Sequence, residues 1–301
     1  MLKHETLIGY RGNEAAQGTG LLVFDLFALR ERKGHVIATL FRARALQRSM
    51  IAIHPLIDLP EIEPGDDLPA LLHVSLAAAG LLPFQPQDVL VVTQKIISKA
   101  EGRFVDLDDV TPGDAARDLS ETTRKDPRLV QLVLDEAASV VRAVPHVLIT
   151  RHRLGHVMAN SGIDRSNIGP DGGERALLLP VDPDGSAVVL RAALGAADDN
   201  PPAIVISDSF GRPWRHGVTA VAIGAAGLPA LVDRRGDIDR DGRRLEVTQI
   251  ALGDQIATAA ALATGEGAEG VPAVLIRGLT YPAGDAPATA QVRPLEEDLF
   301  R

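Results

Sequence analysis

The pattern of hydrophobic and polar residues becomes regular at Met50 and predicts a mixture of strands and helices beyond it. Apolar runs bounded by turn residues predict buried strands. A longer segment that follows an aspartate and ends at Gly80 predicts a capped helix. The predicted strands are 51–53, a run beginning at Asp88, 140–149, 203–206 and 271–276, and the predicted helices are 68–79 and 254–264.

This succession does not have the steady strand-helix alternation of a doubly wound parallel sheet. Asp241-Gly242 is typical of a hairpin turn, and Gly185-Ser186 breaks a polar segment before the apolar run 187–190. Hairpin signals mixed with helices favour an α+β fold. We expect mixed or antiparallel sheets with flanking helices.

Residues 1–49 differ from the rest of the chain. Their second half is rich in arginine, and no clear strand or turn pattern is visible in them. We therefore predict a poorly packed extension over 1–49, which a start codon upstream of a true start at Met50 would explain, and one functional domain over 50–301. A truncation beginning at Met50 that lost activity or solubility would count against this hypothesis.

The apolar run 20–29 does not have the form of a signal peptide. Asp25 interrupts it, and Arg30-Glu31-Arg32 follows where a small-residue cleavage site would be needed. No stretch approaches the roughly 20 apolar residues of a membrane-spanning helix. We expect a cytoplasmic protein.

Composition and charge narrow the classes of function. The 301 residues are 46% hydrophobic and 24% charged, which is sufficient for a large core. The net charge of −9 argues against nucleic acid or an anionic membrane as a general partner. The absence of cysteine excludes disulfides, thiolate metal sites and a cysteine nucleophile. An anion bound by this chain must therefore be held by a local cluster of cations.

Such a cluster is present in the run 89–99. Lys95 and Lys99, two of the five lysines in the chain, lie four residues apart in an apolar segment. A spacing of four places both ammonium groups on one side of either a strand or a helix. Two compact charges on one side suit an anionic ligand such as phosphate. The plain alternative is two solvated lysines at a strand end.

Two segments match the residue letters of known binding motifs, but their surrounding sequence excludes the corresponding sites. Residues 265–270 have the letters of a dinucleotide fingerprint, but they follow a predicted helix and precede a strand, the reverse of the order that this site requires. Their glycines still allow the backbone to approach a ligand closely. Residues 237–242 resemble the start of an EF-hand loop, but Thr248 occupies the position of its bidentate glutamate.

Oxygen donors cluster in short loops at predicted strand ends. Residues 160–167 contain Asp164 among amides and hydroxyls, and Asp208 and Ser209 follow an apolar strand. Glu266 adds a third acid in the glycine-bearing loop. Such donors suit magnesium or manganese, which share their coordination with substrate phosphates. Each aspartate alone is often just a turn or helix cap, so the prediction of a metal site depends on all three acids together.

The same segments carry a resemblance to a known family. From about Ile51 onward the chain resembles the coenzyme F420-0:L-glutamate ligases, the GTP-dependent γ-glutamyl ligases of deazaflavin coenzyme biosynthesis. The resemblance implies an α+β fold and a homodimer. It is carried by matches in the same order at residues 59–62 with 65–68, 94–103, 160–167, 207–213, 265–272 and 293–301.

The resemblance also implies a GTP site and two divalent-cation sites. The cations would be Mg²⁺ or Mn²⁺, with K⁺ as a further candidate. One cation would be bound by Asp164 and Asp208, and the other by Ser209 and Glu266, where other members of the family often have threonine and can have an amide. The residues implied to hold GTP are Leu59, Pro60, Glu61, Ile62, Gln94, Lys95, Lys99, Asn167, Thr264, Gly265, Glu266, Gly267, Ala268, Glu269, Gly270 and Val271.

The reaction implied by the resemblance joins L-glutamate to coenzyme F420-0. GTP phosphorylates the terminal carboxylate of the acceptor's phospholactyl arm, and the amine of glutamate then displaces phosphate to form an amide. Because an anion attacks an anion, the protein must supply positive charge and alignment. Lys95 and Lys99 are the expected fixed cations. Arg165 and Arg212 are further catalytic candidates for binding the acyl phosphate or a carboxylate, with ordinary surface pairing as the alternative.

Several alternatives remain open around this site. His152, His156 or His216 could take the proton of the incoming amine, although their spacing singles out no catalytic pair. The scaffold could also serve a non-catalytic GTP-binding protein, or a ligase for a different acceptor or amino acid. Some relatives continue into a nitroreductase-like second domain; because this chain stops at Arg301, we expect no flavin-dependent second activity.

Overall fold

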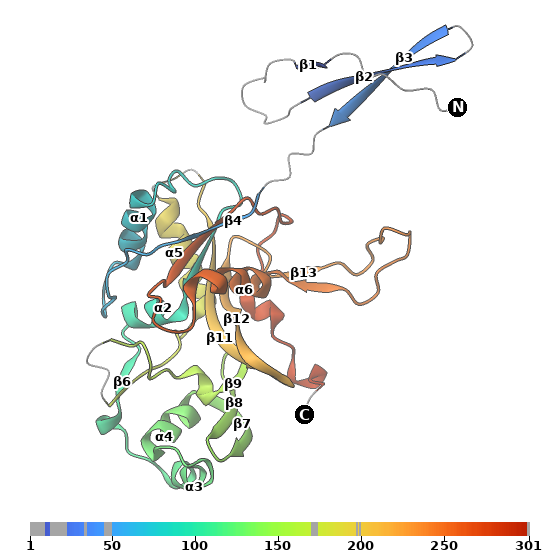
Figure 1. Ribbon diagram of the computed structural model, residues 1–301. Helices are drawn as coiled ribbons and strands as arrows, with labels where there is room; N and C mark the ends of the chain where they lie inside the picture. The colour runs from blue at the N-terminus through green and yellow to red at the C-terminus, as the bar shows by residue number, and fades with distance from the viewer. Residues whose placement is uncertain are drawn as a thin grey trace. The chain divides into compact units, whose positions relative to one another are not determined.

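The computed structural model describes residues 10–12, 23–32, 35–44, 50–169, 174–196, 198 and 200–299 (Figure 1). The chain divides into two compact units, Met1–Met50 and Ile51–Arg301. The two units are described separately below.

The N-terminal unit contains strands where the sequence predicted none. Strand β2 (Val23–Arg32) pairs antiparallel with β3 (His35–Arg44), with Arg32 opposite His35, and β1 (Tyr10–Gly12) pairs with β2. These residues therefore form strands that the sequence pattern did not reveal, and the poorly packed extension over 1–49 stays a prediction. Apolar residues and arginines do not alternate strictly here, but a hairpin satisfies its backbone hydrogen bonds whatever the side-chain pattern.

A mixed five-stranded sheet forms the centre of the second unit. Its order is β12-β11-β5-β15-β4. Strands β5 and β11 run parallel, and the other neighbours are antiparallel. This arrangement confirms the predicted α+β class. The strands are β4 (Ala52–Pro55), β5 (Val89–Thr93), β11 (Ala203–Arg212), β12 (Arg215–Ala226) and β15 (Ala273–Arg277).

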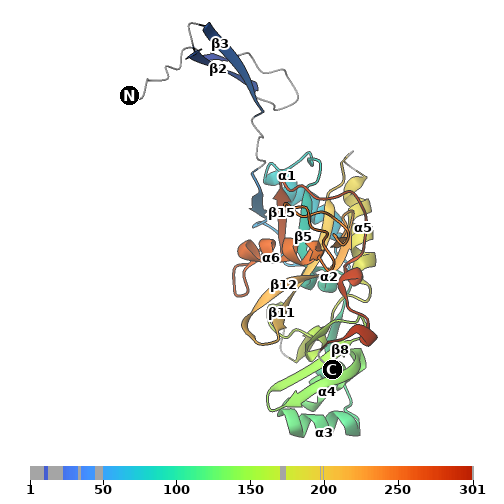
Figure 2. The ribbon, with the colours of Figure 1, turned by 90° about the vertical axis from the view of Figure 1, so that its right-hand side faces the viewer.

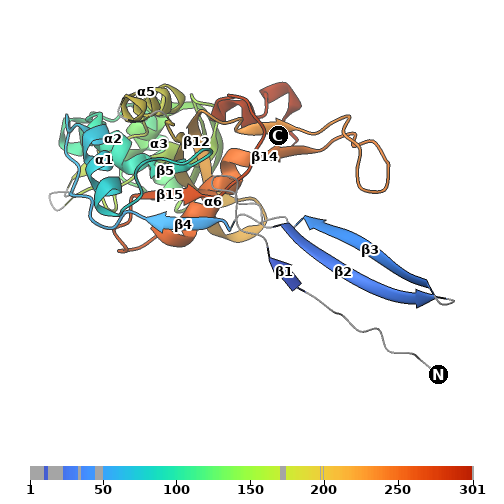
Figure 3. The same cartoon turned by 90° about the horizontal axis from the view of Figure 1, so that it is seen from above.

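Helices cover both faces of this sheet. Because successive side chains of a strand point to opposite faces, Leu90 and Val92 pack in one buried cluster with α1 (Leu68–Ala78) and α5 (Pro183–Gly195), whereas Val89 and Val91 pack in another with α6 (Leu252–Thr264). Figures 2 and 3 show α5 and α6 on opposite sides of β5 and β15. Both predicted helices are confirmed: Asp67 caps α1 by accepting from the N–H of Ala70 at 3.1 Å, and α6 begins two residues before its predicted start.

A smaller lobe with its own core lies beyond one end of the sheet (Figure 1). The predicted single strand 140–149 is wrong, because the chain reverses at Pro145-His146, where His146 has φ +67°. Two antiparallel strands result, and β7 is largely exposed. The lobe consists of β6 (Phe104–Asp106), η1 (Leu107–Asp109), α3 (Asp114–Thr123), α4 (Pro127–Glu136), β7 (Ala137–Val144), β8 (Val147–His152), β9 (Val157–Ala159), η2 (Asn160–Gly162) and β10 (Arg175–Leu177).

The remaining elements in the described part of the second unit are one pair of short strands and two short helices. Strand β13 (Leu231–Asp233) pairs with β14 (Gln249–Ala251), and the excursion between them turns at Gly242, with φ +88°, as the Asp241-Gly242 pair predicted. Gly185-Ser186 is no break, because both residues lie in the first turn of α5. Short helices η3 (Ala288–Gln291) and η4 (Leu295–Glu297) follow. Across the described residues, no helix is long and apolar enough to cross a membrane.

Candidate active site

The candidate site lies where the direction of the strands changes within the sheet. Parallel strands β5 and β11 place Thr93 beside Ser207 at one edge. Strand β15 is antiparallel to β5, so the glycine-rich loop that precedes it arrives at the same edge, and the N–H of Thr93 donates to the carbonyl of Pro272 at 2.9 Å. The carboxyl ends of parallel strands are a common place for ligand sites, because the connecting loops diverge there.

Helix α2 (Gln94–Ala100) begins directly after β5 and carries both lysines. The segment is therefore helical, which the spacing alone left open, and both ammonium groups lie on its cleft side. Lys95 forms an ion pair with Asp164 at 2.8 Å, and Lys99, only 5% exposed, is paired with the carboxylate of Glu61. The lysines are thus held by acids from two other segments of the chain, and the reading as two solvated lysines is wrong.

These elements enclose a cleft of about 660 Å³. The implied nucleotide-binding residues line it, with the exception of Glu269. The lining is formed by Leu59, Pro60, Glu61, Ile62, Thr93, Gln94, Lys95, Ile96, Lys99, Asn167, Gly169, Ser207, Asp208, Ser209, Ala220, Thr264, Gly265, Glu266, Gly267, Ala268, Gly270, Val271 and Pro272.

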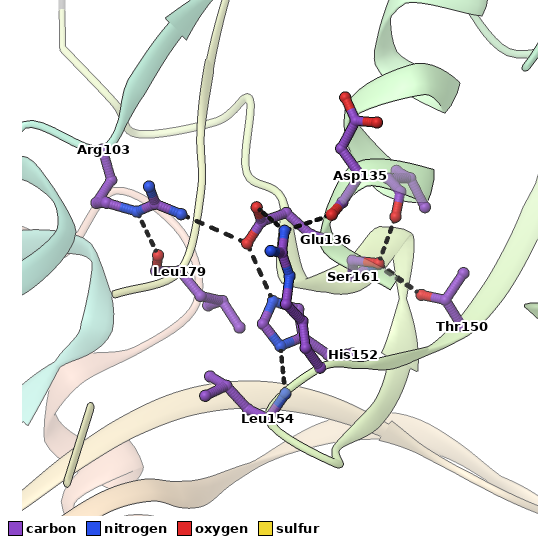
Figure 4. Close-up of polar contacts among 10 residues, drawn as sticks. Arg103, Asp135, Glu136, Thr150, His152, Leu154, Ser161 and Leu179 are labelled. Carbon is purple, nitrogen blue, oxygen red and sulfur yellow. Dashed lines mark hydrogen bonds and ion pairs between the residues drawn. The ribbon is translucent and has the colours of Figure 1, made fainter. Parts of the chain in front are cut away.

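The loop that carries Asp164 is held in an unusual backbone conformation. Asn160, Ser161 and Gly162 all have positive φ, at +50°, +51° and +69°. The buried Ser161 anchors this turn: its N–H donates to the Thr150 hydroxyl at 3.1 Å, and its own hydroxyl donates to the carbonyl of Val133 at 2.9 Å (Figure 4). Left-handed residues are costly unless their surroundings fix them, so these bonds set the direction in which the chain leaves towards Asp164.

Asp208 and Glu266 line the cleft; Asp164 is not among the lining residues, but it contacts Lys95 and Gln94, which are. Asp208 and Ser209 lie within β11, which pairs with β12 as far as Arg212, so the predicted loop over 207–212 is wrong. The hydroxyl of Ser209 donates to Glu266 at 2.6 Å. Withdrawal from water raises the pKa of Asp208 to about 7, and the negative charges of Asp164 and Glu266 add to this effect.

This donor set fits the divalent cations that the family resemblance implies. Carboxylate and hydroxyl oxygens are the ligands that Mg²⁺ and Mn²⁺ prefer. Burial first, and then the charges of Asp164 and Glu266, raise the pKa of Asp208, and a cation bound among the acids would offset the repulsion between them. Over the part of the chain that the structure describes, no group of three or more histidine, aspartate or glutamate side chains could hold an ion alone.

The glycine-rich loop closes one side of the cleft. Gly265 has φ +67°, and a Cβ atom there would lie 2.2 Å from the Glu269 side chain, so only glycine fits. Glu269 turns back to accept from the N–H of Gly267 at 2.7 Å, and it does not line the cleft. The side-chain amide of Asn167 donates to the carbonyl of Gly267 at 3.0 Å. Asn167 and the glycine-rich loop, which the family resemblance assigns to the same GTP site, are therefore in contact.

The two candidate arginines are not among the residues that line the cleft. Arg212 lies on the exposed end of the β11–β12 hairpin and donates to the carbonyl of His216 at 3.2 Å. The pKa of Asp126 is lowered mainly by its hydrogen bond with Arg128, and the charge of Arg165 contributes. Their proposed catalytic roles stay predictions.

The candidate histidines are also placed away from the lining. His152 is 3% exposed; its Nδ1 accepts from the N–H of Leu154, and its Nε2 lies 3.3 Å from Glu136 (Figure 4). His156 packs edge-on against Phe210, and burial lowers its pKa to about 4, with the charge of His152 adding to the effect. A buried imidazole of such low basicity is a poor acceptor for an ammonium proton.

Sequence reasoning missed several residues of the lining. Thr93 and Ser207 end the buried parts of the two parallel strands, and Ile96, Gly169, Ala220 and Pro272 complete the group. The position after a buried parallel strand is itself a signal for a site. It could have identified Thr93 and Ser207, but only if the two strands had been known to be parallel.

Comparison with known proteins agrees with this geometry. The profile of the F420-0:Gamma-glutamyl ligase family matches residues 56–278. The Coenzyme F420:L-glutamate ligase of Methanopyrus kandleri is 43% identical over 245 residues, which cover 80% of this chain and 94% of the relative.

Two further relatives carry the same name. The Coenzyme F420:L-glutamate ligase of Methanothermobacter thermautotrophicus is 42% identical over 247 residues, covering 81% of this chain and 96% of the relative. That of Halobacterium salinarum is 43% identical over 250 residues, covering 81% and 92%. With a profile match over most of its length and relatives this similar, the chain belongs to the F420-0:gamma-glutamyl ligase family, a family of ligases.

Proposed function

We propose that this protein is a GTP-dependent ligase that joins L-glutamate to coenzyme F420-0 through an acyl phosphate. The products are an amide, GDP and phosphate, and a further addition forms a γ-glutamyl link. The names of the relatives indicate F420 and L-glutamate as the substrates. GTP and the acyl phosphate come from the family resemblance of the sequence.

The observation that carries the proposal is the meeting of two lysines, Asp208, Glu266 and a glycine-rich loop in one cleft, with Asp164 in contact with Lys95 and Gln94 of its lining. These residues come from segments far apart in the sequence, and they occupy positions that match the family's motifs. Lys95 and Lys99 supply fixed positive charge for nucleotide phosphates, and the glycine-rich loop lets its backbone approach the nucleotide. A triphosphate is negative and its cations are positive. A cleft that contains both lysines and acids therefore suits them better than a cleft with charges of one sign.

Two divalent cations are part of the proposal. Asp164 and Asp208 would hold one, and Ser209 and Glu266 would hold the other. When bound, such cations neutralise the charge that develops on the phosphates during transfer.

The chain's own residues have clear tasks in this reaction. The carboxylate of the acceptor attacks the γ-phosphorus of GTP, and the bond to the bridging oxygen of GDP breaks. The amine of L-glutamate then attacks the acyl carbon, and phosphate leaves. Lys95 and Lys99 align the phosphates, and Leu59, Pro60 and Ile62 line the cleft beside them.

The test is a complete reaction with the full chain. GTP, Mn²⁺, L-glutamate and coenzyme F420-0 are incubated with the protein, and GDP, phosphate and product mass are followed; ATP replaces GTP in a parallel reaction. Glutamylated product that depends on GTP supports the proposal. GTP turnover without that product would indicate a different acceptor, and GTP binding without turnover would indicate a non-catalytic GTP-binding protein.

The family resemblance also leads us to propose a homodimer. Light scattering coupled to gel filtration should give twice the chain mass. A measured mass near 31.9 kDa would contradict this assembly.

A further inference from the structure

The carboxylate of Asp164 is held by a side chain that is itself held by a buried serine. Gln94, 1% exposed, donates from Nε2 to Asp164 Oδ2 at 2.7 Å. Ser98, fully buried, donates from its hydroxyl to Gln94 Oε1 at 2.9 Å. The order of contacts is therefore hydroxyl, amide, carboxylate, and each of the first two groups is shielded from water.

The direction of this chain of hydrogen bonds follows from its members. An ionised carboxylate only accepts hydrogen bonds, so the amide of Gln94 must present its NH₂ group to Asp164. Its carbonyl oxygen then faces Ser98, whose hydroxyl can donate. The reversed amide would place Oε1 against the carboxylate, where two oxygens repel each other. The carboxylate therefore selects the orientation of the amide, and Ser98 holds the amide in it by donating to Oε1.

The helix and its anchor fix the position of the serine hydroxyl. Gln94 and Ser98 lie one turn apart in α2, so their side chains meet on the same face. The carbonyl of Ser98 accepts from the N–H of Arg103 at 2.9 Å. The side chain of Arg103 in turn binds the carbonyl of Leu179 at 2.9 Å and contacts Glu136 (Figure 4). The serine is thus tied to neighbouring segments and does not depend on the helix alone.

The carboxylate is also restrained from its own side. The backbone of Asp164 exchanges two hydrogen bonds of 2.9 Å with Leu177. Gln94 and Lys95 both contact the same oxygen, Oδ2. These two contacts restrain the carboxylate through one of its oxygens.

We propose that Ser98 is a positioning residue for the cation site, acting through Gln94 on Asp164. The inference rests on the proposed function, in which Asp164 binds a divalent cation. Groups that orient a metal ligand typically contribute roughly tenfold to a hundredfold in metal affinity. Removing the hydroxyl allows the Gln94 amide to turn, and the carboxylate loses the donor that holds it.

The experiment measures Mn²⁺ binding to the full chain by calorimetry in the presence of saturating GDP, which supplies phosphate oxygens without turnover. Ser98→Ala is expected to weaken Mn²⁺ binding by roughly tenfold to a hundredfold, and Ser98→Thr, which keeps the hydroxyl, is expected to restore most of it. Ser75→Ala is the matched control, since Ser75 is a buried helical serine of α1, 7% exposed. It should bind Mn²⁺ like the unaltered chain.

A double-mutant cycle separates positioning from a general effect on folding. In a Gln94→Leu background, Ser98→Ala should have no further effect on Mn²⁺ affinity, because the amide through which it acts is gone. Full additivity of the two substitutions would overturn the inference. If Ser98→Ala does not fold, Ser98→Cys replaces it, because cysteine is nearly isosteric with serine and is a weaker donor. Weaker Mn²⁺ binding is expected for this variant as well.

The outcomes also separate this inference from the proposed function. Unchanged Mn²⁺ affinity in Ser98→Ala, with binding by the unaltered chain intact, would overturn the role of Ser98 alone. Failure of the unaltered chain to bind Mn²⁺ would overturn the cation site itself, and this inference with it.

Discussion

Replacing His156 with leucine should remove a pH-dependent loss of stability. His156 is 9% exposed, and its Nε2 has no hydrogen-bond partner among the described residues. Burial, reinforced by the charge of His152 and opposed by that of Asp184, lowers its pKa from 6.5 to about 4. The protein therefore folds with a neutral imidazole at this position.

The sign of the effect follows from proton linkage. Between pH 6.5 and pH 4 the unfolded chain binds a proton that the folded chain does not, so stability is full above pH 6.5 and falls as the pH decreases towards 4. With these two pKa values, the loss between pH 7 and pH 5 is about 2 kcal/mol. The leucine variant lacks this contribution.

The assay is urea unfolding of the wild-type and His156→Leu chains at pH 7 and pH 5. Other groups also titrate, so the informative quantity is the difference in unfolding free energy between the two proteins. This difference should shift by about 2 kcal/mol in favour of the variant at pH 5. His216→Leu is the control, because that side chain is exposed to water in the folded state. An equal difference between wild type and His156→Leu at both pH values would refute the reasoning.

Three further changes test the site and the core. Asp208→Asn should abolish metal-dependent ligation while the circular dichroism spectrum stays native, and full activity would refute the metal assignment. Lys99→Met should raise the Kd for GTP by roughly tenfold to a hundredfold, the value of a charge-assisted hydrogen bond, measured by calorimetry; an unchanged Kd would exclude a phosphate contact. Asp88→Ala should lower the unfolding free energy by about 3–5 kcal/mol, because it leaves Arg277, paired with the fully buried Asp88 side chain at 2.7 Å, without its anion; a loss below 1 kcal/mol in urea unfolding would contradict this.

The local predictions that held are those that depend on neighbours in the sequence. The helix beginning at Leu68 was predicted from an aspartate cap and a terminal glycine, and both features are present: Asp67 accepts from the N–H of Ala70, and Gly80 has φ +68°. Capping is satisfied by groups a few residues apart. No other part of the chain is needed to recognise it.

The predictions that failed depend on partners distant in the sequence. The run 140–149 is mostly apolar, which is typical of one buried strand, yet it reverses at His146 and its first half is exposed in β7. Asp208 and Ser209 were placed in a loop because polar residues follow an apolar run, yet pairing with β12 continues the strand. The length of a paired strand depends on its partner strand, and the local sequence pattern does not reveal that partner.

The sequence by itself determined which chemical groups the site contains: two lysines four residues apart, three acids with hydroxyl and amide neighbours, and a glycine-bearing loop over 265–270. The tertiary structure decided that they meet. Parallel pairing of β5 with β11, and the antiparallel entry of β15, bring Lys95, Asp208 and Glu266 to one edge of the sheet. The physical reason is that spacing along a chain fixes only near neighbours, whereas strand order and register are set by the packing of both sheet faces at once.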